Sequence, residues 1–400
     1  MASLIFGALL AQGAAALQDS VSLPLSLAYG DGSSQVMTTF RMGHPEGEPL
    51  SVVADTGSAN FWIFGPNATV NYGSQYLGVP GPCNETASPF YNYTASNAAT
   101  APEAFGPAEY AYGGNSKFID STFTVNDTVN AAFPDASESV VGVRVAVAES
   151  AMYRQYDDGS CAGLDHETGI LGLAPFANTT TGPSFRQDLL DQGTVTSKVL
   201  SMWFEANEGA ATAPLNGTAL IGAVDHTKYS GELVELPLFS SPSSVGYFVG
   251  VPKVTINGGI VALENSTSDC LIDSGSIFDT LPFTNETEFL DATGLVDLQG
   301  FIAYPSACDD IPANATIDYL FDGAKDGESV TVKIPLRNYA KGSGDFLGET
   351  DKCGIQIQQG YDACTLAAPF FTGAFITADD EAGTFAVAQG GLRGSYSEEK

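Results

Sequence analysis

Basic residues are scarce in this 400-residue sequence: Lys and Arg number 15 against 47 Asp and Glu, a formal net charge of −32 at pH 7. So acidic a chain is a poor partner for nucleic acid or an anionic membrane. Only 16% of the residues are charged, against about 25% in ordinary soluble domains. Because 44% are hydrophobic, with 44 Gly and 21 Pro, the composition excludes an acidic disordered tail and predicts a globular, loop-rich chain.

Metal-binding patterns are also lacking. The three histidines are scattered and the six cysteines include no C-x-x-C pair, so we expect no metal site, no cofactor and no Ser-His-Asp triad. Surface positions are expected for His44, His166 and His226. Six cysteines without metal-ligand spacing are typical of three disulfide bonds formed in an oxidising compartment.

Long hydrophobic runs are confined to the N-terminus. Residues 1–17 read MASLIFGALLAQGAAAL, which predicts a signal peptide despite the missing basic start, with a buried first strand as the alternative. No later stretch approaches the roughly 18 apolar residues of a transmembrane helix. We therefore predict a secreted protein without a membrane partner; an acidic vacuolar or lysosome-like compartment is the alternative.

Asn-X-Thr sequons without an intervening proline support entry into the secretory pathway. One sequon means little, and composition alone would supply several in a chain rich in Asn and Thr. The candidate glycosylation sites are Asn67, Asn84, Asn92, Asn126, Asn178, Asn216, Asn265, Asn285 and Asn314.

Most segments are short, rich in Val, Ile, Thr, Phe and Tyr, and bounded by Gly, Pro, Asn or Asp, which is typical of an all-β protein. Clear examples of expected strands are 51–54, 117–129, 140–148, 231–238, 249–256 and 330–336. Helical patterns are few: one runs over 183–192, and another over 286–292 begins at a capping box of Asn285 and Glu288. Residues 66–107 are expected to be an irregular surface insertion.

An internal repeat carries the candidate chemistry. Residues 51–58 read SVVADTGS and residues 270–276 read CLIDSGS, so each apolar strand ends in Asp-Thr/Ser-Gly-Ser. A single copy would be expected in a hairpin turn. Two copies in matched strand contexts indicate a paired site built on Asp55 and Asp273.

Two facing turns of this kind bring the carboxylates of Asp55 and Asp273 together. Like charges at short range cannot both ionise easily, so the pair shares one proton. One carboxylate can then take a proton from water while the other donates to a carbonyl oxygen. The glycines let the backbone approach, and the hydroxyl groups bond across the turns or to the carboxylates; these support residues are Thr56, Gly57, Ser58, Ser274, Gly275 and Ser276.

The chain resembles the pepsin-like aspartic proteases, of the two-lobed secreted fungal type, over nearly its whole length. Residues 55–62, DTGSANFW, are similar to the family's first active-site segment, and 273–276 with Leu281-Pro282 to its second. The stretches GILGL at 169–173 and LIGAVD at 220–225 follow the family's order. The resemblance also implies that the two aspartates share one proton, as in that family.

The resemblance implies an all-β, bilobal fold: two pseudo-symmetric β lobes with the active-site cleft between them, and a few short helices. We expect an N-terminal lobe with the first catalytic aspartate and the flap over 18–226, and a C-terminal lobe with the second over 227–394. At roughly 150 residues per domain, the length suggests two or three domains.

The resemblance also implies a β-hairpin flap that closes over the bound peptide and excludes water. The segment AEYAYGGNS at 108–116 matches its tip, so Tyr112 and Gly113 are the expected flap residues, with Tyr110 as the alternative by register. Tyr112 is expected to hydrogen-bond towards Trp62. Without the resemblance, both aromatic residues would be read as ordinary packing residues.

Among the cysteines, one pair matches the family's second-lobe disulfide by placement. Two others lie next to expected strands, and the remaining two would then tie down the insertion, although six cysteines permit fifteen pairings. The expected bonds are Cys308–Cys353, Cys270–Cys364 and Cys83–Cys161.

One position departs from the family. The first lobe has Gly172 after Ile170-Leu171, whereas the second has Ala367 where a glycine normally packs beneath the catalytic turn. An added methyl group in a tight core costs about 1–3 kcal/mol where the site cannot relax. We therefore expect the geometry of the second turn to be slightly disturbed, although both Asp-Thr/Ser-Gly-Ser motifs are intact.

The function implied is that of an aspartic endopeptidase acting on proteins or peptides at acid pH, as a monomer, with a preference for apolar residues around the cut. The alternative is a catalytically weak or silent homologue that binds peptides or carbohydrates or acts as an inhibitor protein; loss of an aspartate would mark it, and neither is lost. A glycosidase needs carboxyl groups about 5–9 Å apart, which these symmetric turns do not call for.

Acid conditions would also account for the scarcity of basic residues. Near pH 4 many of the carboxylates are protonated, since their reference pKa values are about 3.9 and 4.3. We therefore expect repulsion among ionised acids to destabilise the protein at neutral and alkaline pH.

Overall fold

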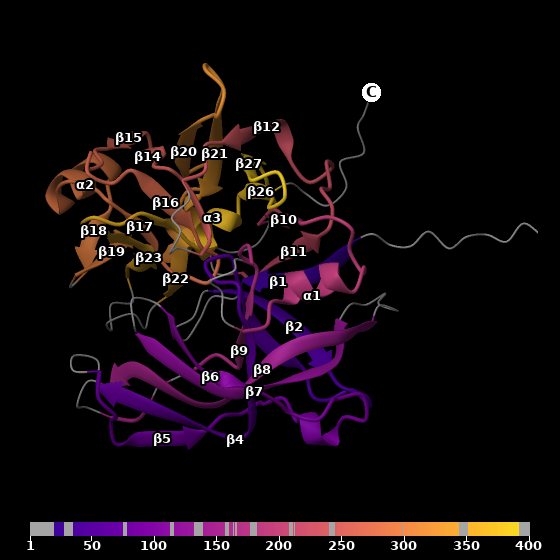
Figure 1. Cartoon of the computed structure of the whole chain (residues 1–400). Coiled ribbons are helices and arrows are strands. Elements are labelled where there is room, and N and C mark those ends of the chain that lie inside the picture. The colour runs from indigo at the N-terminus through magenta and orange to yellow at the C-terminus, as the bar shows by residue number, and fades with distance from the viewer. Residues whose placement is uncertain are drawn as a thin grey trace, which may run out of the picture.

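The computed structural model describes residues 20–27, 35–74, 78–112, 116–131, 139–156, 160–162, 164, 166–176, 182–207, 211, 213–239, 245–298, 300–343 and 351–391. Within them the chain forms two β lobes, with most of the N-terminal half below and most of the C-terminal half above in Figure 1. The predicted all-β, bilobal fold is confirmed. The expected signal peptide at 1–17, Gly113 and Asn178 lie outside the described residues.

The largest sheet runs through both lobes. Strand β26, near the end of the chain, pairs antiparallel with β10, and β27 pairs with β12, so the C-terminal strands extend a sheet that begins in the first lobe. In hydrogen-bonded order the strands are β12 (Ser230–Leu236), β27 (Thr384–Gln389), β26 (Ala374–Asp379), β10 (Val199–Phe204), β11 (Leu215–Ile221), β1 (Val21–Leu27), β2 (Val36–Met42), β3 (Leu50–Asp55), β9 (Gly169–Gly172), β4 (Phe61–Ser74), β8 (Ser139–Tyr156), β7 (Lys117–Ala131) and β6 (Glu103–Tyr112), with β5 (Cys83–Thr86) paired to β4.

Smaller sheets build the second lobe. One contains β13 (Tyr247–Gly250), β16 (Asp269–Ile272), β25 (Thr365–Leu366), β17 (Asp279–Leu281) and β24 (Ile357–Gln359). Another contains β15 (Gly259–Val261), β14 (Lys253–Ile256), β20 (Thr316–Asp322) and β21 (Ser329–Pro335), and a third contains β18 (Val296–Leu298), β19 (Phe301–Tyr304), β23 (Cys353–Ile355) and β22 (Ala340–Ser343).

Helices are short. They are α1 (Phe185–Asp191), α2 (Glu286–Thr293) and α3 (Ala368–Phe371), with 3-10 turns at Tyr93–Ala95, Cys308–Asp310 and Leu336–Tyr339. Both helices predicted from the sequence are confirmed: Ser184 caps α1, and the Asn285 side chain accepts a hydrogen bond from the Glu288 amide at 3.1 Å. In the described part of the chain, no helix has the length and hydropathy needed to cross a membrane.

The strands follow the polarity pattern of the sequence. Buried and half-exposed side chains alternate along β1 and β2, as expected for strands with one face on the core. The strand predicted over 249–256 is wrong in one respect, because Val251-Pro252 separates β13 from β14, and proline has no N–H for the ladder. Residues 66–107 are not simply an irregular insertion, since β4 continues to Ser74, β5 lies in this segment and β6 begins in it.

Three disulfide bonds join segments that are far apart in the sequence. They join Cys83 to Cys161, Cys270 to Cys364 and Cys308 to Cys353, with Cα–Cα distances of 5.7, 4.5 and 4.8 Å. These are the pairs named from the sequence. Cys270 lies in β16 and Cys364 directly precedes β25, so this bond links the two parallel strands beneath the turn that carries Asp273.

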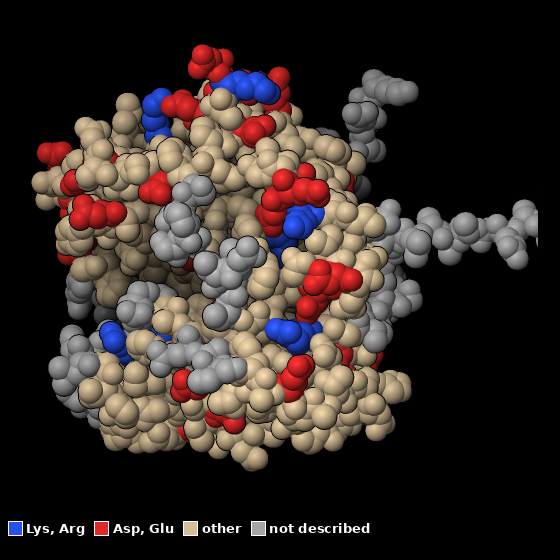
Figure 2. Space-filling view, in the orientation of Figure 1, with Lys and Arg blue, Asp and Glu red and all other residues tan. Residues whose placement is uncertain are grey.

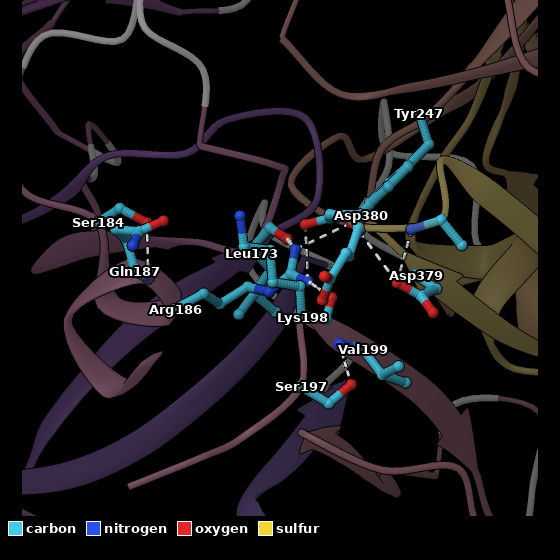
Figure 3. A network of polar contacts seen from close by, with 12 residues as sticks. Leu173, Ser184, Arg186, Gln187, Ser197, Lys198, Val199, Tyr247, Asp379 and Asp380 are labelled. Atoms are coloured by element: carbon cyan, nitrogen blue, oxygen red, sulfur yellow. Dashed lines mark hydrogen bonds and ion pairs between the residues drawn. The ribbon is translucent and has the colours of Figure 1, made fainter. Parts of the chain in front are cut away.

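A buried arginine joins the two lobes (Figure 3). Arg186 in α1 donates to the carbonyl oxygens of Leu173, at 2.6 Å, and Lys198, at 2.8 Å. It also donates to the Tyr247 hydroxyl in β13 and pairs with the Asp380 carboxylate after β26, each at 2.9 Å. Burial raises the pKa of Asp380, and the charge of Arg186 opposes that rise. The arginine therefore compensates a carboxylate that would otherwise be costly to bury.

We predict that Arg186→Met lowers the free energy of unfolding by about 3–5 kcal/mol, because loss of one partner leaves the other buried charge uncompensated. Urea unfolding at pH 6 measures the change. The matched control is Lys253→Met, which removes an ion pair to Asp322 whose side chains are 71% and 77% exposed. The control should alter stability by no more than about 0.5 kcal/mol, and equal effects of the two variants would contradict the prediction.

Candidate active site

The two Asp-Thr/Ser-Gly-Ser turns meet where the lobes face each other. Strand β3 ends at Asp55 beside β9, and β16 ends just before Asp273 beside β25, both in parallel pairings. The Thr56 amide donates to the Ser274 hydroxyl and the Ser274 amide donates to the Thr56 hydroxyl, each at 3.0 Å. Each hydroxyl then donates to a carbonyl oxygen of the other lobe: Thr56 to Ile272 at 2.8 Å and Ser274 to Ala54 at 2.6 Å.

Each carboxylate receives the same pair of donors. Asp55 accepts from the Gly57 amide at 2.8 Å and from the Ser58 hydroxyl at 2.5 Å. The equivalent bonds to Asp273, from the amide and the hydroxyl two and three residues later, are 2.9 and 2.6 Å. The sequence repeat is therefore repeated as a hydrogen-bonding pattern, and it fixes the orientation of both carboxyl groups.

Glycine is required in both turns. A Cβ atom at Gly57 would lie 2.6 Å from Cγ of Asp273, and one at Gly275 would lie 2.5 Å from Oδ1 of Asp55. These contacts are closer than real Cβ atoms tolerate, so any side chain at either position would push the two carboxylates apart. The absence of a side chain is what lets the turns face each other at hydrogen-bonding range.

The two aspartates form one titrating unit. Burial raises the pKa of Asp55 well above its usual range, and the charge of Asp273 and a hydrogen bond to it raise it further. The bonds from Ser58 and Gly57 act in the opposite direction, because they favour the ionised form. Asp55 is only 5% exposed. Such a pair can retain one proton under conditions in which isolated aspartates have lost theirs.

A hairpin tyrosine lies against the site. Tyr112, at the end of β6, accepts a hydrogen bond from Nε1 of the fully buried Trp62 at 2.9 Å. Burial and the charge of Asp55 raise the pKa of Tyr112 well above 10, so its hydroxyl stays protonated. The hydroxyl of the alternative residue, Tyr110, is buried and makes no hydrogen bond to a described group.

A cleft of about 750 Å³ contains the dyad and Tyr112. It lies where the lobes meet, and Figure 2 shows a hollow between the upper and lower halves of the molecule on a face with more acidic than basic side chains. Its apolar lining residues are Met37, Val53, Ile170, Ile277 and Phe278. An extended peptide laid across this cleft would pass both carboxylates.

The departure at Ala367 is absorbed by a residue that sequence reasoning missed. In the first lobe the Gly172 amide donates to the backbone carbonyl of Asn60 at 3.0 Å, and a Cβ there would lie 2.4 Å from the backbone of Ala59. In the second lobe the amide of Ala367 donates instead to the Asp279 side chain at 2.6 Å. The Asp279 carboxylate thus takes the place that the backbone carbonyl of Asn60 has in the first lobe.

Asp279 is fully buried and is stabilised by two tyrosines. The hydroxyls of Tyr319 and Tyr339 both reach its Oδ2, at 2.5 and 2.7 Å, and they contact each other at 2.8 Å. Burial raises the pKa of Asp279 to about 6, and these hydrogen bonds limit the rise. The signal was present in the sequence, because aligning the two motifs places Asp279 opposite the apolar Phe61.

His166 corrects another expectation. Its side chain is 9% exposed and is not on the surface, in contrast to the exposed His44 and His226. The imidazole packs among aromatic rings, and its Nδ1 lies 2.8 Å from the Glu85 carboxylate. In the described part of the chain, no group of three or more His, Cys, Asp or Glu side chains could hold a metal ion.

Most of the predicted glycosylation sites that are described are exposed. Asn126, in β7, is half-buried. The exposed ones are Asn67, Asn84, Asn92, Asn216, Asn265, Asn285 and Asn314.

Two crossed Asp-Thr/Ser-Gly-Ser turns beneath a hairpin tyrosine define the class of pepsin-like aspartic proteases. The chain matches the family described as eukaryotic aspartyl protease over residues 35–390, and it belongs to that family. It is 24% identical to gastricsin of Callithrix jacchus over 313 residues, 78% of this chain and 68% of that protein. It is also 24% identical to candidapepsin-4 of Candida albicans over 349 residues, 86% and 73%, and 25% identical to cathepsin D of Dictyostelium discoideum over 289 residues, 71% and 65%.

The raised pKa values predict that the midpoint of unfolding decreases as the pH is raised from 4 to 8. A carboxyl group whose pKa is raised by folding stabilises the fold fully below its unfolded pKa of about 3.9, and that stability is lost as pH rises through the folded value. In the folded protein the pKa is about 6 for both Asp188 and Asp279. The pKa of Asp55 in the folded protein is higher still.

In Asp279→Asn the side chain cannot ionise. The free energy of unfolding of this variant should therefore fall less than that of wild type between pH 4 and pH 6, by about 3 kcal/mol for a shift of this size. Urea titrations across this range measure the difference. Asp322→Asn, at a side chain that is 77% exposed, should retain the wild-type slope. A midpoint that rises steadily from pH 4 to 8 would contradict the account.

Proposed function

We propose that the protein is an acid endopeptidase whose catalytic residues are Asp55 and Asp273. The observation that carries the proposal is the arrangement of the two carboxylates, held in contact by crossed turns, with the Ser58 and Ser276 hydroxyls on their outer oxygens. Membership in the aspartyl protease family supports the same activity. Within the proposal, the lobe boundary lies at residues 226 and 227, and the enzyme acts as a monomer.

The reaction follows from one shared proton. A water molecule between the carboxylates gives a proton to the ionised one as its oxygen attacks the peptide carbonyl carbon, while the protonated one donates to the carbonyl oxygen. The resulting diol then collapses: the C–N bond breaks, a diol hydroxyl returns its proton to a carboxylate, and the leaving nitrogen takes a proton from the dyad. The pair ends with one proton, as it began, and no group beyond water and carboxylates is required.

The cleft surroundings support a peptide substrate. Apolar side chains at Met37, Val53, Ile170 and Phe278 favour apolar residues around the cut. Tyr112 is the flap residue of this proposal, and Trp62 fixes it through its indole N–H. A flap so held over the peptide excludes bulk water and strengthens the electrostatic interactions inside.

Secretion is part of the proposal. The N-terminal apolar segment at 1–17 would direct export, and the exposed sequons would be glycosylated. Some relatives carry the name secreted aspartic protease, including those of Candida albicans. An acidic extracellular medium would keep many of the surface carboxyl groups protonated and therefore neutral.

We predict that Asp55→Asn and Asp273→Asn each lower hydrolysis by about 10²–10⁴-fold, the range typical of a lost general acid or base. A digest of denatured protein from pH 2 to 6 measures this. The matched control is Asp188→Asn, at a partly buried aspartate in α1 whose pKa is also raised but which does not line the cleft. Cleavage that survives either dyad substitution would contradict the assignment of the catalytic residues, whereas an inactive wild type would favour a silent homologue that only binds peptides.

A second prediction concerns the flap. Tyr112→Phe keeps the ring but removes the acceptor for the indole N–H of Trp62, so kcat/KM should fall about tenfold, the effect of one lost hydrogen bond. Tyr110→Phe is the matched control, since its hydroxyl makes no hydrogen bond to a described group. Peptide hydrolysis at pH 4 compares the two variants. A larger loss in Tyr110→Phe than in Tyr112→Phe would reverse the assignment of the flap residue.

A further inference from the structure

One part of the cleft wall is polar, although the rest of the lining suits apolar side chains. Lys117, Tyr153, Arg154, His166 and Glu167 all line the same cleft as the catalytic aspartates. The mechanism proposed above uses none of them. Polar groups in a mostly apolar pocket are the ones that select a ligand.

Strand register places the centre of this wall beside the flap. Lys117 in β7 lies directly opposite Tyr112 in β6 and directly opposite Tyr153 in β8, so the three residues form a row across the sheet. The Lys117 ammonium lies 5.5 Å from the centre of the Tyr112 ring. The same hairpin that carries the flap tyrosine therefore carries a cation next to the reaction centre.

The ammonium group is held by a carboxylate. Lys117 donates to Glu167, and their side chains are only 14% and 9% exposed. Glu167 precedes Thr168-Gly169-Ile170, and Ile170 pairs with Val53, two residues before the first catalytic aspartate. The ion pair is thus fixed to the strands that carry the catalytic turn.

The Lys117 ammonium keeps hydrogen-bond donors that its partner does not use. An ammonium has three N–H donors, and Glu167 takes one of those of Lys117. Burial, the charge of Glu167 and a hydrogen bond to Glu167 raise the pKa of Tyr153 well above 10, so the Tyr153 hydroxyl keeps its proton and helps to hold Glu167. Nε of Arg154 is buried and makes no hydrogen bond to a described group.

The polar part of the cleft wall carries two positive charges, whereas the protein as a whole is strongly negative. The chain has only 15 Lys and Arg against 47 Asp and Glu, yet Lys117 and Arg154 both line this cleft. Glu167 offsets one of these two cations and is itself already engaged by Lys117. A substrate cation would have to compete with Lys117 for Glu167, whereas a substrate anion would meet unused donors.

We propose that Lys117 and Arg154 form a subsite for a carboxylate side chain of the substrate, so that the enzyme selects peptides with Asp or Glu close to the scissile bond. This inference rests on the proposed function and deepens it. The Lys117 ammonium donates to the carboxylate, and the Arg154 guanidinium adds a second positive charge. Glu167 holds Lys117 in place and sets the strength of the attraction.

The test measures binding, so it does not depend on turnover. The probes are octapeptides whose central peptide bond is replaced by a non-cleavable CH2–NH bond, with Glu, Gln, Leu or Lys placed in turn at each of the three positions on either side. Calorimetry at pH 5.5, where most Glu side chains are ionised, gives the Kd values. At one position, the Glu peptide should bind about tenfold more tightly than the Leu or Gln peptide, and the Lys peptide should bind most weakly.

Two variants give opposite expectations. Lys117→Met should abolish the preference for Glu over Gln. Glu167→Gln leaves the ammonium uncompensated and should strengthen the preference several-fold, a result that a merely structural ion pair would not give. Lys253→Met removes an exposed lysine outside the cleft and should bind like wild type. Thermal unfolding of each variant checks that it is folded before its binding is compared.

The outcomes separate the subsite from the protease activity. Equal Kd values for Glu and Leu peptides at every position, tighter binding of the Lys peptide, or no binding of any peptide would overturn the subsite. So would a preference that survives in Lys117→Met. The cleavage of denatured protein described above decides the proposed function independently, since a protease without this preference would still digest it.

Discussion

The four hydrogen bonds that cross between the two Asp-Thr/Ser-Gly-Ser turns hold the rest of the site in place. Thr56 and Ser274 each accept from the opposite backbone and donate to the opposite lobe, so neither turn is complete without the other. Because Gly57 and Gly275 leave no side chain between the turns, the carboxylates meet at hydrogen-bonding range. The repulsion of two like charges is thereby built into the fold, and the proton that relieves it is the one that the proposed reaction uses.

Acid conditions suit the interior of this protein as well as its surface. The buried carboxyl group of Asp279 receives two tyrosine hydroxyls and one backbone amide, and Asp380 receives an arginine and a tyrosine. Burial raises the pKa of both. Burying each carboxyl group therefore costs less free energy at low pH, where the group is protonated. The composition and the internal packing thus favour the same pH range.

The sequence alone predicted the parts that depend on local pattern. Strand alternation and the repeated Asp-Thr/Ser-Gly-Ser gave the all-β class and the two turns, because both signals are contained in a few adjacent residues. The roles of Asp279 and His166 depend on partners far away in the sequence, such as Ala367 and Glu85, and the residues next to them in the sequence do not indicate these partners. Comparing the two halves of the chain could have found Asp279, since its counterpart is apolar.

The pairing of β26 with β10 has a consequence for the growing chain on the ribosome. Met202 pairs with Ile376, so one edge of β10 has no partner until more than 170 further residues have been made. At about 5–20 residues per second, that interval is roughly 10–35 s. Throughout it, an apolar strand edge with the sequence VLSMWF is open to pairing with any other strand. The last strands of the chain thus act as the intramolecular cap that ends this exposure.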